Sequence, residues 1–486
     1  MRSLRTALTA GAAALTLLLT AVTAATAEGT ATPGGTPTRA APRTTPLPRV
    51  TDDHGRALTL RGWNVEDKIH RGADALSAIT ERHFADMAAR GFTTARLLVF
   101  WDDLEPRRGH YSARYLARVE RVLDWARKHR VRVVIDAHQD VFGPRFGHRG
   151  IPEWATRTDG LPFTPHPDDW FAEYFEPAVQ AAFQHLYEDP DLRRAQARMW
   201  QVLAQRFRHH PAVLGYDFLN EPMGRVRDGE SLPQAAARIE ARQLTPMYGR
   251  LARAVRRVDR DAWLFIEPTP LVGEGVPTAL GAVADPRPGG RRLVYAPHFY
   301  NQRMEAGGDY DPAEGWLERY EAAVTDYPRR HGMPVWVGEW GPADSSLPNM
   351  GRFHEDALAS MDRYATGWAG YVWCYGGGYC ALDAEGRFRP NKGRTMRPYA
   401  PAVAGRVLSD GYDPRTAAYR LAYLPRPGRT VTELSLPPSE SGWRIRTAGP
   451  VRARTDRVPP ADHARTVRVS AYGRVPATVT VTPLGR

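Results

Sequence analysis

Glu221 stands at the end of a strongly apolar run, VLGYDFLNEP, which covers residues 213–222. Apolar and aromatic side chains fill most positions of this run, a pattern typical of a strand buried on both faces of a parallel sheet. A carboxylate directly after a buried strand is costly to desolvate unless it faces a cleft. Pro222 ends the strand and stiffens the turn, which predicts fixed positions for Asn220 and Glu221.

A second run of the same form, PVWVGEWG at residues 334–341, ends near Glu339. Gly338 and Gly341 flank this glutamate, at positions where the backbone can need unusual dihedrals or close approach. Parallel sheets place catalytic groups at the carboxyl ends of their strands, so we expect the two carboxylates to meet there. Such a pair predicts glycoside hydrolysis, with Glu221 as general acid/base and Glu339 as nucleophile, about 5 Å apart in a retaining enzyme.

Eight short apolar runs alternate with helical or loop-rich segments. The helical segments, such as RYLARVERVLDWARKHR, carry apolar residues three and four positions apart, which indicates amphipathic helices. Alternation of strand and helix indicates a parallel sheet, and eight strands in about 340 residues predict an α/β fold, the (β/α)8 TIM barrel. The predicted strands are residues 58–65, 93–100, 131–140, 213–222, 262–268, 292–300, 334–341 and 368–375.

Further polar side chains occur at the ends of the predicted strands. Arg96 beside Glu339 would lower the pKa of that carboxyl and keep it ionised. We expect Tyr300 to hydrogen-bond Glu339, and Asn220 to bond a sugar 2-hydroxyl in the transition state. Glu221 must begin protonated, which requires surroundings that raise its pKa. The set at the strand ends is Arg96, Asp136, His138, Asp140, Asn220, Glu221, His298, Tyr300, Glu339 and Trp373.

Some of these residues also have a purely structural explanation when taken alone. Arg96 is compatible with an ion pair in the barrel core, His298 with a hydrogen-bonded core histidine, and Trp373 with packing. Their shared position at one end of successive strands favours a site, in which Trp373 offers a flat apolar face to a sugar ring. Glu267, on the fifth strand, is the main rival carboxylate, and we expect it to support the structure or the substrate.

The chain after residue 397 loses helical periodicity and shows short β-rich runs separated by proline and glycine. Such runs predict a small antiparallel β-sandwich packed on the barrel. We therefore divide the mature chain into a catalytic barrel at residues 49–397 and a sandwich domain at residues 398–486. The sandwich is either a docking module for membrane or glycan or a stabilising partner of the barrel.

The first residues have the features of an export signal. Arg2 and Arg5 precede a run rich in Ala, Leu and Thr that leads to a small-residue cleavage site after Ala27, so residues 1–27 are expected to form a signal peptide. The run is too short and too mixed with threonine to favour a retained membrane helix. Residues 28–48 are rich in Thr, Pro, Gly and Ala and predict a disordered linker. We expect the mature protein to be secreted.

The net charge of +12 does not indicate a nucleic acid partner. Nearly all the basic residues are arginines, scattered along helical segments without interleaved aromatic side chains. Cys374 and Cys380 would close a small loop in an exported protein, although a buried free Cys374 is an alternative. Two cysteines without clustered histidines do not form a zinc site, and we expect no metal, no cofactor and a monomeric chain.

Taken together, the residues at the strand ends resemble the endoglycoceramidases within the cellulase-like glycoside hydrolase family 5. The resemblance spans nearly the whole mature chain. Three stretches depart from it. GEWG stands where GEFG is expected, residues 141–143 are VFG where VYS is expected, and CYGGGYC at residues 374–380 is unfamiliar. All three lie at the rim of the site and leave the preferred glycan open. Besides the strand-end residues, the resemblance rests on residues 138–141, Pro152-x-Trp154, residues 297–300 and RPYAPAVAG at 397–405.

The resemblance implies cleavage of the bond between a glycan and ceramide, with retention of configuration. Glu221 would be the acid/base and Glu339 the nucleophile. The stretch around Lys68, NVEDKIHRG, fits the resemblance loosely, and Lys68 is also compatible with an ordinary surface lysine. The residues implied in sugar binding are Lys68, His138, Asp140, Trp154, Asn220 and Trp373, and Arg96, His298 and Tyr300 complete the predicted substrate-binding set.

The segment after the third predicted strand, residues 141–187, is long and rich in aromatic side chains. Long barrel loops are usually functional, and an apolar lid beside the cleft would suit an acyl chain or a membrane surface. The alternative is that these side chains pack into a small core of the loop itself.

The leading hypothesis is a secreted retaining β-glycosidase that acts on glycosphingolipids and contacts a membrane or micelle surface. The near alternative is an endo-β-glucanase or mannanase, which would need a long groove lined with aromatic residues. The three departures noted above would also suit galactosylceramide, a steryl glucoside or another lipid glucoside as substrate. A non-catalytic carbohydrate or lipid binder is the distant alternative, and the presence of both glutamates argues against it.

Overall fold

The computed structural model describes residues 46–428 and 430–485. The predicted signal peptide and most of the predicted linker lie outside the described residues. Seven parallel strands pair in the order β7-β6-β5-β4-β3-β2-β8. These strands are β2 (Leu60–Val65), β3 (Thr94–Phe100), β4 (Arg132–His138), β5 (Val213–Asp217), β6 (Trp263–Ile266), β7 (Leu293–Tyr295) and β8 (Gly367–Gly370).

The seventh predicted strand, residues 334–341, lies between β7 and β8 and closes the sheet. Val335 pairs in parallel with Tyr295 at the end of β7, and Val337 pairs in parallel with Trp368 of β8. These are isolated bridges rather than a regular ladder, so the segment carries no strand label. The bridges complete the ring, and the prediction of a (β/α)8 TIM barrel is confirmed.

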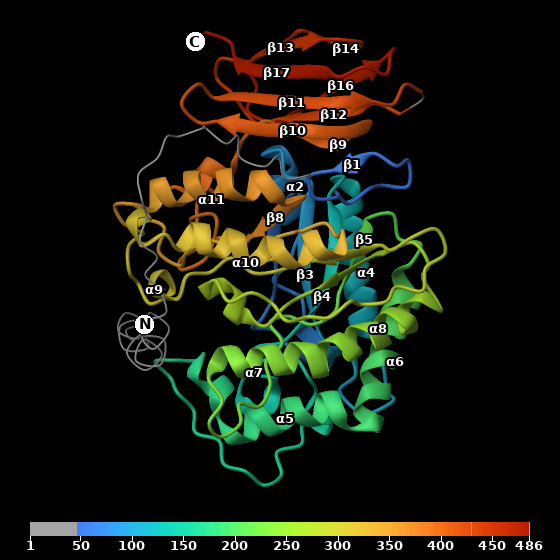
Figure 1. Ribbon diagram of the computed structural model, residues 1–486, viewed down its shortest axis with the longest axis vertical. Coiled ribbons are helices and arrows are strands. Elements are labelled where there is room, and N and C mark those ends of the chain that lie inside the picture. The colour runs from blue at the N-terminus through green and yellow to red at the C-terminus, as the bar shows by residue number, and fades with distance from the viewer. Residues whose placement is uncertain (1–45, 429, 486) are drawn as a thin grey trace, which may run out of the picture.

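Helices cover the outside of the barrel (Figure 1). In α4, Val119, Val122 and Ala126 are buried, while polar side chains fill the opposite face. Ser112 caps this helix by accepting a hydrogen bond from the Tyr115 N–H. The α-helices are α2 (Glu81–Ala89), α3 (Trp101–Leu104), α4 (Ala113–Lys128), α5 (Pro177–Glu188), α6 (Pro190–Phe207), α7 (Leu232–Ile239), α8 (Thr245–Arg256), α9 (Gln302–Glu305), α10 (Trp316–His331) and α11 (Met350–Tyr364).

Two antiparallel five-stranded sheets form the C-terminal part of the chain, which agrees with the predicted sandwich. One sheet has the order β1-β9-β12-β16-β14 and the other β10-β11-β17-β13-β15. Their facing side chains, including Tyr419, Leu434 and Val479, form a separate hydrophobic core. The strands are β1 (Ala57–Leu58), β9 (Tyr399–Val403), β10 (Gly405–Asp413), β11 (Ala418–Pro425), β12 (Thr432–Leu436), β13 (Trp443–Ala448), β14 (Val451–Ala453), β15 (Arg457–Val458), β16 (Arg465–Ala471) and β17 (Ala477–Pro483).

The first predicted strand, residues 58–65, is two strands in the structure. Leu58 belongs to β1 and pairs with Ala402 of the sandwich, whereas Leu60 begins β2 of the barrel. The apolar pattern continues through both strands because each is buried, so the pattern alone does not reveal the change of sheet. The N-terminal segment therefore ties the sandwich to the barrel.

The sandwich lies at one end of the barrel, beside β1 and α11 (Figure 1). The Ser435 hydroxyl and the Tyr399 hydroxyl donate to the carbonyl of Gly91 at 2.9 and 3.0 Å, just before β3 begins. This end carries the amino termini of the strands, so the carboxyl ends face away from the sandwich. Among the described residues, no helix combines the length and the apolar character that a membrane span requires.

Candidate active site

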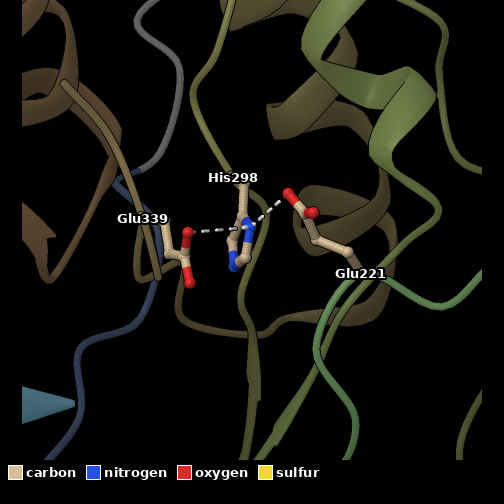
Figure 2. A group of neighbouring side chains, drawn as sticks. All are labelled: Glu221, His298 and Glu339. Atoms are coloured by element: carbon tan, nitrogen blue, oxygen red, sulfur yellow. Dashed lines mark hydrogen bonds and ion pairs between the residues drawn. The ribbon is translucent and has the colours of Figure 1, made fainter. Parts of the chain in front are cut away.

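Glu221 follows β5, Glu339 lies in the closing segment 334–341, and His298 follows β7. An oxygen of each carboxylate and a ring nitrogen of His298 lie within 4.8 Å of one another. Figure 2 shows the imidazole between the two carboxylates, with Nδ1 2.8 Å from Glu221 Oε1 and 3.9 Å from Glu339 Oε2. Three strand ends that are far apart in sequence thus meet at the carboxyl rim of the barrel, as the sequence pattern predicts.

The surroundings of His298 favour the charged form of its imidazole. Burial lowers the pKa of the imidazole, but the carboxylates of Glu267 and Glu339 and the hydrogen bond to Glu221 outweigh burial and raise it well above its usual value. Nδ1 then donates to Glu221 Oε1, and Nε2 lies 3.4 Å from Glu267 Oε1. His298 is therefore a buried cation that keeps one oxygen of Glu221 occupied.

Arg96 is the second buried cation and joins the largest number of site residues. Its guanidinium lies 2.6 Å from Glu339 Oε1, and the contact between these residues is as predicted. It also lies 3.0 Å from Asp217, 2.8 Å from Glu267 and 3.0 Å from Asp136. Burial lowers the pKa of the guanidinium, but these carboxylates raise it well above its usual value. A single planar fork therefore positions carboxylates from four strand ends.

Asp136, Asp217 and Glu267 are close enough together to suggest a cation site, with oxygens within 4.8 Å of one another. Arg96 bonds all three of these carboxylates and supplies the positive charge from the protein itself. Burial, followed by the neighbouring Glu267 carboxylate, raises the pKa of Asp217 well above its usual value. The guanidinium of Arg96 therefore offsets part of the negative charge of this cluster.

Tyr300 and Asn220 hold the remaining groups of the site. The Tyr300 hydroxyl donates to Glu339 Oε2 at 3.1 Å, which is the predicted contact. Asn220 Oδ1 accepts from Arg96 at 3.0 Å, and its Nδ2 donates to the Gln139 carbonyl at 3.1 Å. One hydrogen of the Asn220 amide group remains available for a ligand.

Glu221 has a backbone φ of +41°, a left-handed conformation that residues with a side chain seldom adopt. Glu267 Oε2 accepts a hydrogen bond from the Glu221 N–H at 2.8 Å, and Gln139 Nε2 donates to the Glu221 carbonyl at 3.1 Å. These bonds stabilise the backbone that aims Glu221 at the cleft. Glu267 has the supporting position that we expected, whereas Gln139 was not among the predicted site residues.

Lys68, His138 and Asp140 form a second cluster. Lys68 Nζ lies 3.0 Å from Asp140, and His138 Nε2 lies 3.5 Å from the same carboxylate. The other imidazole nitrogen is 2.7 Å from Asp136. Burial and Lys68 lower the pKa of His138, but Asp140 and Asp136 outweigh them and raise it to about 9. Asp136 connects this cluster to Arg96, so these three predicted residues belong to the same network.

Trp373 requires a correction. Its side chain is 1% exposed and packs against Trp63, Phe92 and Phe388 in the main hydrophobic core. The face that we expected to stack on a sugar is therefore covered by other aromatic rings. Trp373 was predicted from its place at the end of the eighth predicted strand, but β8 ends at Gly370, so the strand does not fix the direction of this side chain.

Tyr371 is the aromatic side chain that borders the site after β8. Its hydroxyl donates to Glu66 at 2.9 Å, and Lys68 Nζ lies 5.4 Å from its ring centroid. Burial, Glu66 and Glu339 raise its pKa well above the usual value. Both Tyr371 and Trp373 lie beyond the end of β8 at Gly370, so no strand pattern in the sequence distinguishes them.

Trp154 lies in η3 (Glu153–Ala155), within the long segment after β4. Its indole N–H donates to the Glu105 carbonyl at 2.8 Å, and its ring packs edge to face on Trp101. Within the described part of the chain, none of its hydrogen bonds or ring contacts involves the carboxylate centre. Its implied role in sugar binding stays a prediction.

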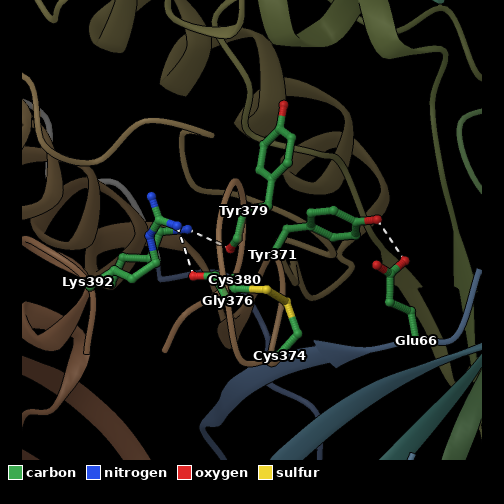
Figure 3. Close-up of a disulfide and its surroundings, with 8 residues drawn as sticks. Glu66, Tyr371, Cys374, Gly376, Tyr379, Cys380 and Lys392 are labelled. Carbon is green, nitrogen blue, oxygen red and sulfur yellow. Dashed lines mark hydrogen bonds between the residues drawn. A yellow bond between two sulfur atoms is a disulfide. The ribbon is translucent and has the colours of Figure 1, made fainter. Parts of the chain in front are cut away.

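Cys374 and Cys380 are paired in a disulfide, which settles a question that the sequence left open (Figure 3). The bond closes a loop that carries Tyr379. The Tyr379 ring lies 5.4 Å from that of Tyr371, and its hydroxyl donates to Glu305. Burial raises the pKa of Glu305 to about 7 despite that hydrogen bond, with Glu221 and Glu339 among the groups that add to the shift. Tyr379 and Glu305 thus extend the polar wall of the site.

The segment 141–187 packs mostly against the barrel. Phe142, Phe146 and Tyr174 are buried in the main hydrophobic core and not in a separate core of the loop. Leu161 and Trp170 are the exposed large apolar residues of the segment, with 40% and 47% of their surfaces accessible. An extended apolar lid is therefore not present, but a small apolar tip is.

Two carboxylates at the carboxyl rim of a (β/α)8 barrel, held by buried cations, define a glycoside hydrolase. Residues 51–377 match the family model described as Cellulase (glycosyl hydrolase family 5). Because that match covers more than half of the chain, the protein belongs to glycoside hydrolase family 5.

Similar proteins and solved structures indicate which members of the family the chain resembles. It is 26% identical over 410 residues to an endoglycoceramidase from Hydra vulgaris, covering 76% of this chain and 75% of the relative. It is 26% identical over 448 residues to endoglycoceramidase I from Rhodococcus hoagii, covering 89% and 86%. The structure of endo-glycoceramidase II from Rhodococcus sp. in complex with ganglioside GM3 superimposes with a TM-score of 0.79 at 28% identity, covering 91% of this chain and all of that one. The protein is an endoglycoceramidase-like member of the family.

Proposed function

We propose that the protein is a retaining glycosidase that cleaves the bond between the glycan and the ceramide of glycosphingolipids. The observation that carries the mechanism is the approach of Glu221 and Glu339, whose oxygens lie within 4.8 Å of each other. Retaining enzymes hold the two carboxyl groups about 5 Å apart, whereas inverting enzymes leave room for a water between them. The substrate class rests on endoglycoceramidase relatives that align with most of the chain.

In the first step, Glu339 attacks the anomeric carbon while Glu221 donates its proton to the departing ceramide oxygen. This step leaves the glycan esterified to Glu339 and the lipid as a free alcohol. In the second step, Glu221 removes a proton from water, which attacks the anomeric carbon and releases the glycan with its configuration retained. Both glutamates return to their starting states, so the cycle needs no other reactant.

The surrounding contacts suit these roles. Arg96 bonds one oxygen of Glu339 and Tyr300 bonds the other, so the nucleophile is oriented before the substrate binds. His298 occupies Oε1 of Glu221, which leaves Oε2 for the oxygen of the scissile bond. Asn220 presents an amide hydrogen beside Glu221, where a sugar hydroxyl would accept it.

A lipid aglycone would also need apolar contacts near the rim. Ile69 is 83% exposed and follows Lys68, which pairs with Asp140 in the site. With Leu161 and Trp170, it provides apolar side chains at the surface of the barrel loops. We infer that these residues contact the lipid part of the substrate or the surface of the micelle or membrane that holds it.

The test is to incubate the full chain with a lactosyl or ganglioside ceramide in detergent, and in parallel with carboxymethyl cellulose, and to identify products by mass spectrometry. Release of intact oligosaccharide and free ceramide is the expected result. Glu339→Gln should abolish turnover while still binding the glycolipid. Shortened cellulose with untouched glycolipid would instead support an endoglucanase, and full activity of Glu339→Gln would exclude Glu339 as nucleophile.

We further propose that the enzyme acts outside the cell, on the basis of the predicted signal peptide at residues 1–27. N-terminal sequencing of protein recovered from the culture medium should begin directly after Ala27. Recovery of the chain inside the cells with Arg2 and Arg5 still attached would contradict this proposal.

A further inference from the structure

Helices α5, α6, α7 and α8 border a cavity of about 270 Å³. Guanidinium groups dominate its lining. A cavity of this size suits a small polar ligand, because pockets for drug-sized molecules span about 300–1,000 Å³. We call it the arginine cavity, and the arginines that line it are Arg193, Arg227, Arg238, Arg242 and Arg250.

The positive charge of the arginine cavity is largely unpaired. Within the described residues, Arg238 is the lining arginine that has a carboxylate at ion-pair distance, which is Glu230 at 2.7 Å. Glu188 also lines the cavity, but its oxygens accept from Gln243 at 2.8 Å and Gln184 at 3.2 Å. The cavity therefore presents more positive charge than its own carboxylates balance.

Arg250 is the most unusual of these arginines. Its Nε and Nη2 atoms are buried and have no acceptor among the described residues. Burial, together with the neighbouring Arg193 and Arg253, lowers its pKa to about 10. Buried donors of a charged group are ordinarily hydrogen-bonded, because leaving them without an acceptor is unfavourable. The neighbours of Arg250 are themselves positively charged, and its two unpaired N–H groups need an acceptor. An anion in the cavity would supply that acceptor.

The arginine cavity also contacts the loop that carries the predicted acid/base. The hydroxyl of Tyr187, in the cavity wall, donates to the carbonyl of Met223 at 2.7 Å. Arg238 Nη2 donates to the carbonyl of Arg225 at 2.5 Å. Both carbonyls belong to the stretch between Glu221 and α7, so two residues of the cavity wall are hydrogen-bonded to that stretch.

We propose that the arginine cavity binds an oxyanion of the phosphate or sulfate type. Guanidinium groups present donors in a planar fork that matches such oxyanions, and several of them around one small cavity favour a dianion over chloride. The oxyanion is either free in solution or the phosphate of an anionic lipid headgroup. This inference rests on the cavity itself and holds whether or not the substrate is a glycosphingolipid.

The first test is isothermal titration calorimetry of the full chain with inorganic phosphate, at an ionic strength held constant with chloride. Arg250→Met should weaken phosphate binding about tenfold or more, because charge-assisted hydrogen bonds are lost. Arg257→Met is the matched control, since it removes an exposed arginine just after α8. It should bind phosphate as the wild type does. Equal binding by the wild type and both variants, or no binding by the wild type, would overturn the proposal.

Thermal unfolding separates this role from a structural one. Without phosphate, Arg250→Met should unfold at the same temperature as the wild type or higher, because it removes a buried charge that lacks a partner. Phosphate should raise the unfolding temperature of the wild type and of Arg257→Met but not of Arg250→Met. A large loss of stability in Arg250→Met without phosphate would mean that Arg250 serves packing, and would overturn the proposal.

The source of the oxyanion is tested by co-sedimentation with phosphatidylcholine vesicles, with and without phosphatidic acid. Binding that requires both phosphatidic acid and Arg250 would identify the lipid headgroup as the ligand. Phosphate binding without vesicle binding would identify a free oxyanion, and both results support the site. Binding to phosphatidic acid vesicles that Arg250→Met leaves intact, together with unchanged phosphate binding, would overturn it.

Discussion

The two glutamates have different partners, and this difference is the main feature of the site at the scale of single residues. Glu339 is bonded at both oxygens, to Arg96 and Tyr300, whereas Glu221 is bonded to His298 through one oxygen. A nucleophile benefits from fixed orientation, and an acid needs one oxygen free for the substrate. The contacts therefore favour Glu339 as nucleophile and Glu221 as acid/base.

Glycosides with different leaving groups should separate the two roles. Glu221→Gln should lower kcat/KM on a glycolipid by about 10²–10⁴, because the ceramide oxygen then leaves without a proton. A dinitrophenyl glycoside needs no such proton, so the loss in its first step should be much smaller. Glu339→Gln should lose activity on both substrates. Steady-state and burst kinetics measure these effects.

The opposite pattern would reverse the assignment. If Glu339→Gln kept activity on the dinitrophenyl glycoside while Glu221→Gln lost it, Glu221 would be the nucleophile. Glu440→Gln changes an exposed glutamate of the sandwich and serves as the control, with activity expected at the wild-type level.

Glu305 should make stability depend on pH. Burial raises its pKa to about 7, above the value of about 4.3 for an unfolded glutamate. The folded state therefore holds this proton more tightly, and the contribution to stability is fully present below about pH 4.3 and is lost as the pH rises through about 7. Glu305→Gln should reduce the fall in the free energy of unfolding across this range. Urea denaturation at several pH values measures it, and a fall as steep as in the wild type would contradict the assignment.

At the scale of secondary structure, loops rather than helices supply most of the side chains of the candidate site. Glu221, His298 and Glu339 all lie just beyond or outside regular ladders, where the backbone is free of strand pairing. The strands fix where each loop begins, and the buried Arg96 and Glu267 then hold the loops in place. This separation of roles is typical of a barrel. The strands and the core provide a fixed framework, and the loops at the rim carry the functional side chains.

Opening the disulfide should affect activity through Tyr379. The loop closed by Cys374 and Cys380 places Tyr379 against Tyr371 and Glu305. Cys380→Ser should lower the free energy of unfolding by about 2 kcal/mol, the value expected for so short a loop. It should also lower kcat/KM on the glycolipid several-fold, because Tyr379 loses its fixed position. Kinetics with and without a reducing agent, together with denaturation, measure both effects.

Tyr379→Phe keeps the disulfide and removes only the hydroxyl. It should reproduce part of the loss of activity with little loss of stability. If Cys380→Ser lost stability but kept full activity, the loop would have a structural role alone.

At the scale of the whole molecule, the sandwich lies at the end of the barrel opposite the site. Its contacts are with residues before β3 and with β1, so it is well placed to stabilise the barrel. Ala402 of the sandwich shares a hydrophobic cluster with Leu58 and Leu60. The sequence left two roles open for the sandwich, a docking module for membrane or glycan and a stabilising partner of the barrel. The position of the sandwich, away from the candidate site, favours the stabilising role.

The two parts should therefore unfold together. Tyr399→Phe removes the hydroxyl that bonds both Gly91 and Thr93 across the boundary, at 3.0 and 2.9 Å. We expect a loss of about 1–3 kcal/mol in the free energy of unfolding of the whole chain, because buried polar groups lose their partner. Calorimetry should show one transition. Tyr472→Phe, at a tyrosine with 72% of its surface exposed, should change stability by less than about 0.5 kcal/mol. Two separate transitions would contradict this expectation.

The barrel and the approach of the two glutamates at its rim were predictable because both follow from short-range patterns. Apolar runs mark buried strands, and the carboxyl ends of parallel strands converge on one rim. Glu221, Glu339, Arg96 and Tyr300 could therefore be placed together without knowledge of any contact. The sandwich was predictable for the same reason, since its short β-rich runs are a local property of the chain.

Tertiary packing decided what lies beyond the strand ends, because no periodic rule governs the direction of a side chain once a strand stops. The exchange of Trp373 for Tyr371, the hydrogen bonds from Gln139 and the contact between Tyr379 and Glu305 all depend on how separate loops meet. The same applies to the split between β1 and β2, since both sheets bury the same apolar pattern. Local sequence thus determines which residues reach the rim, and the packing of distant loops determines which of them face the substrate.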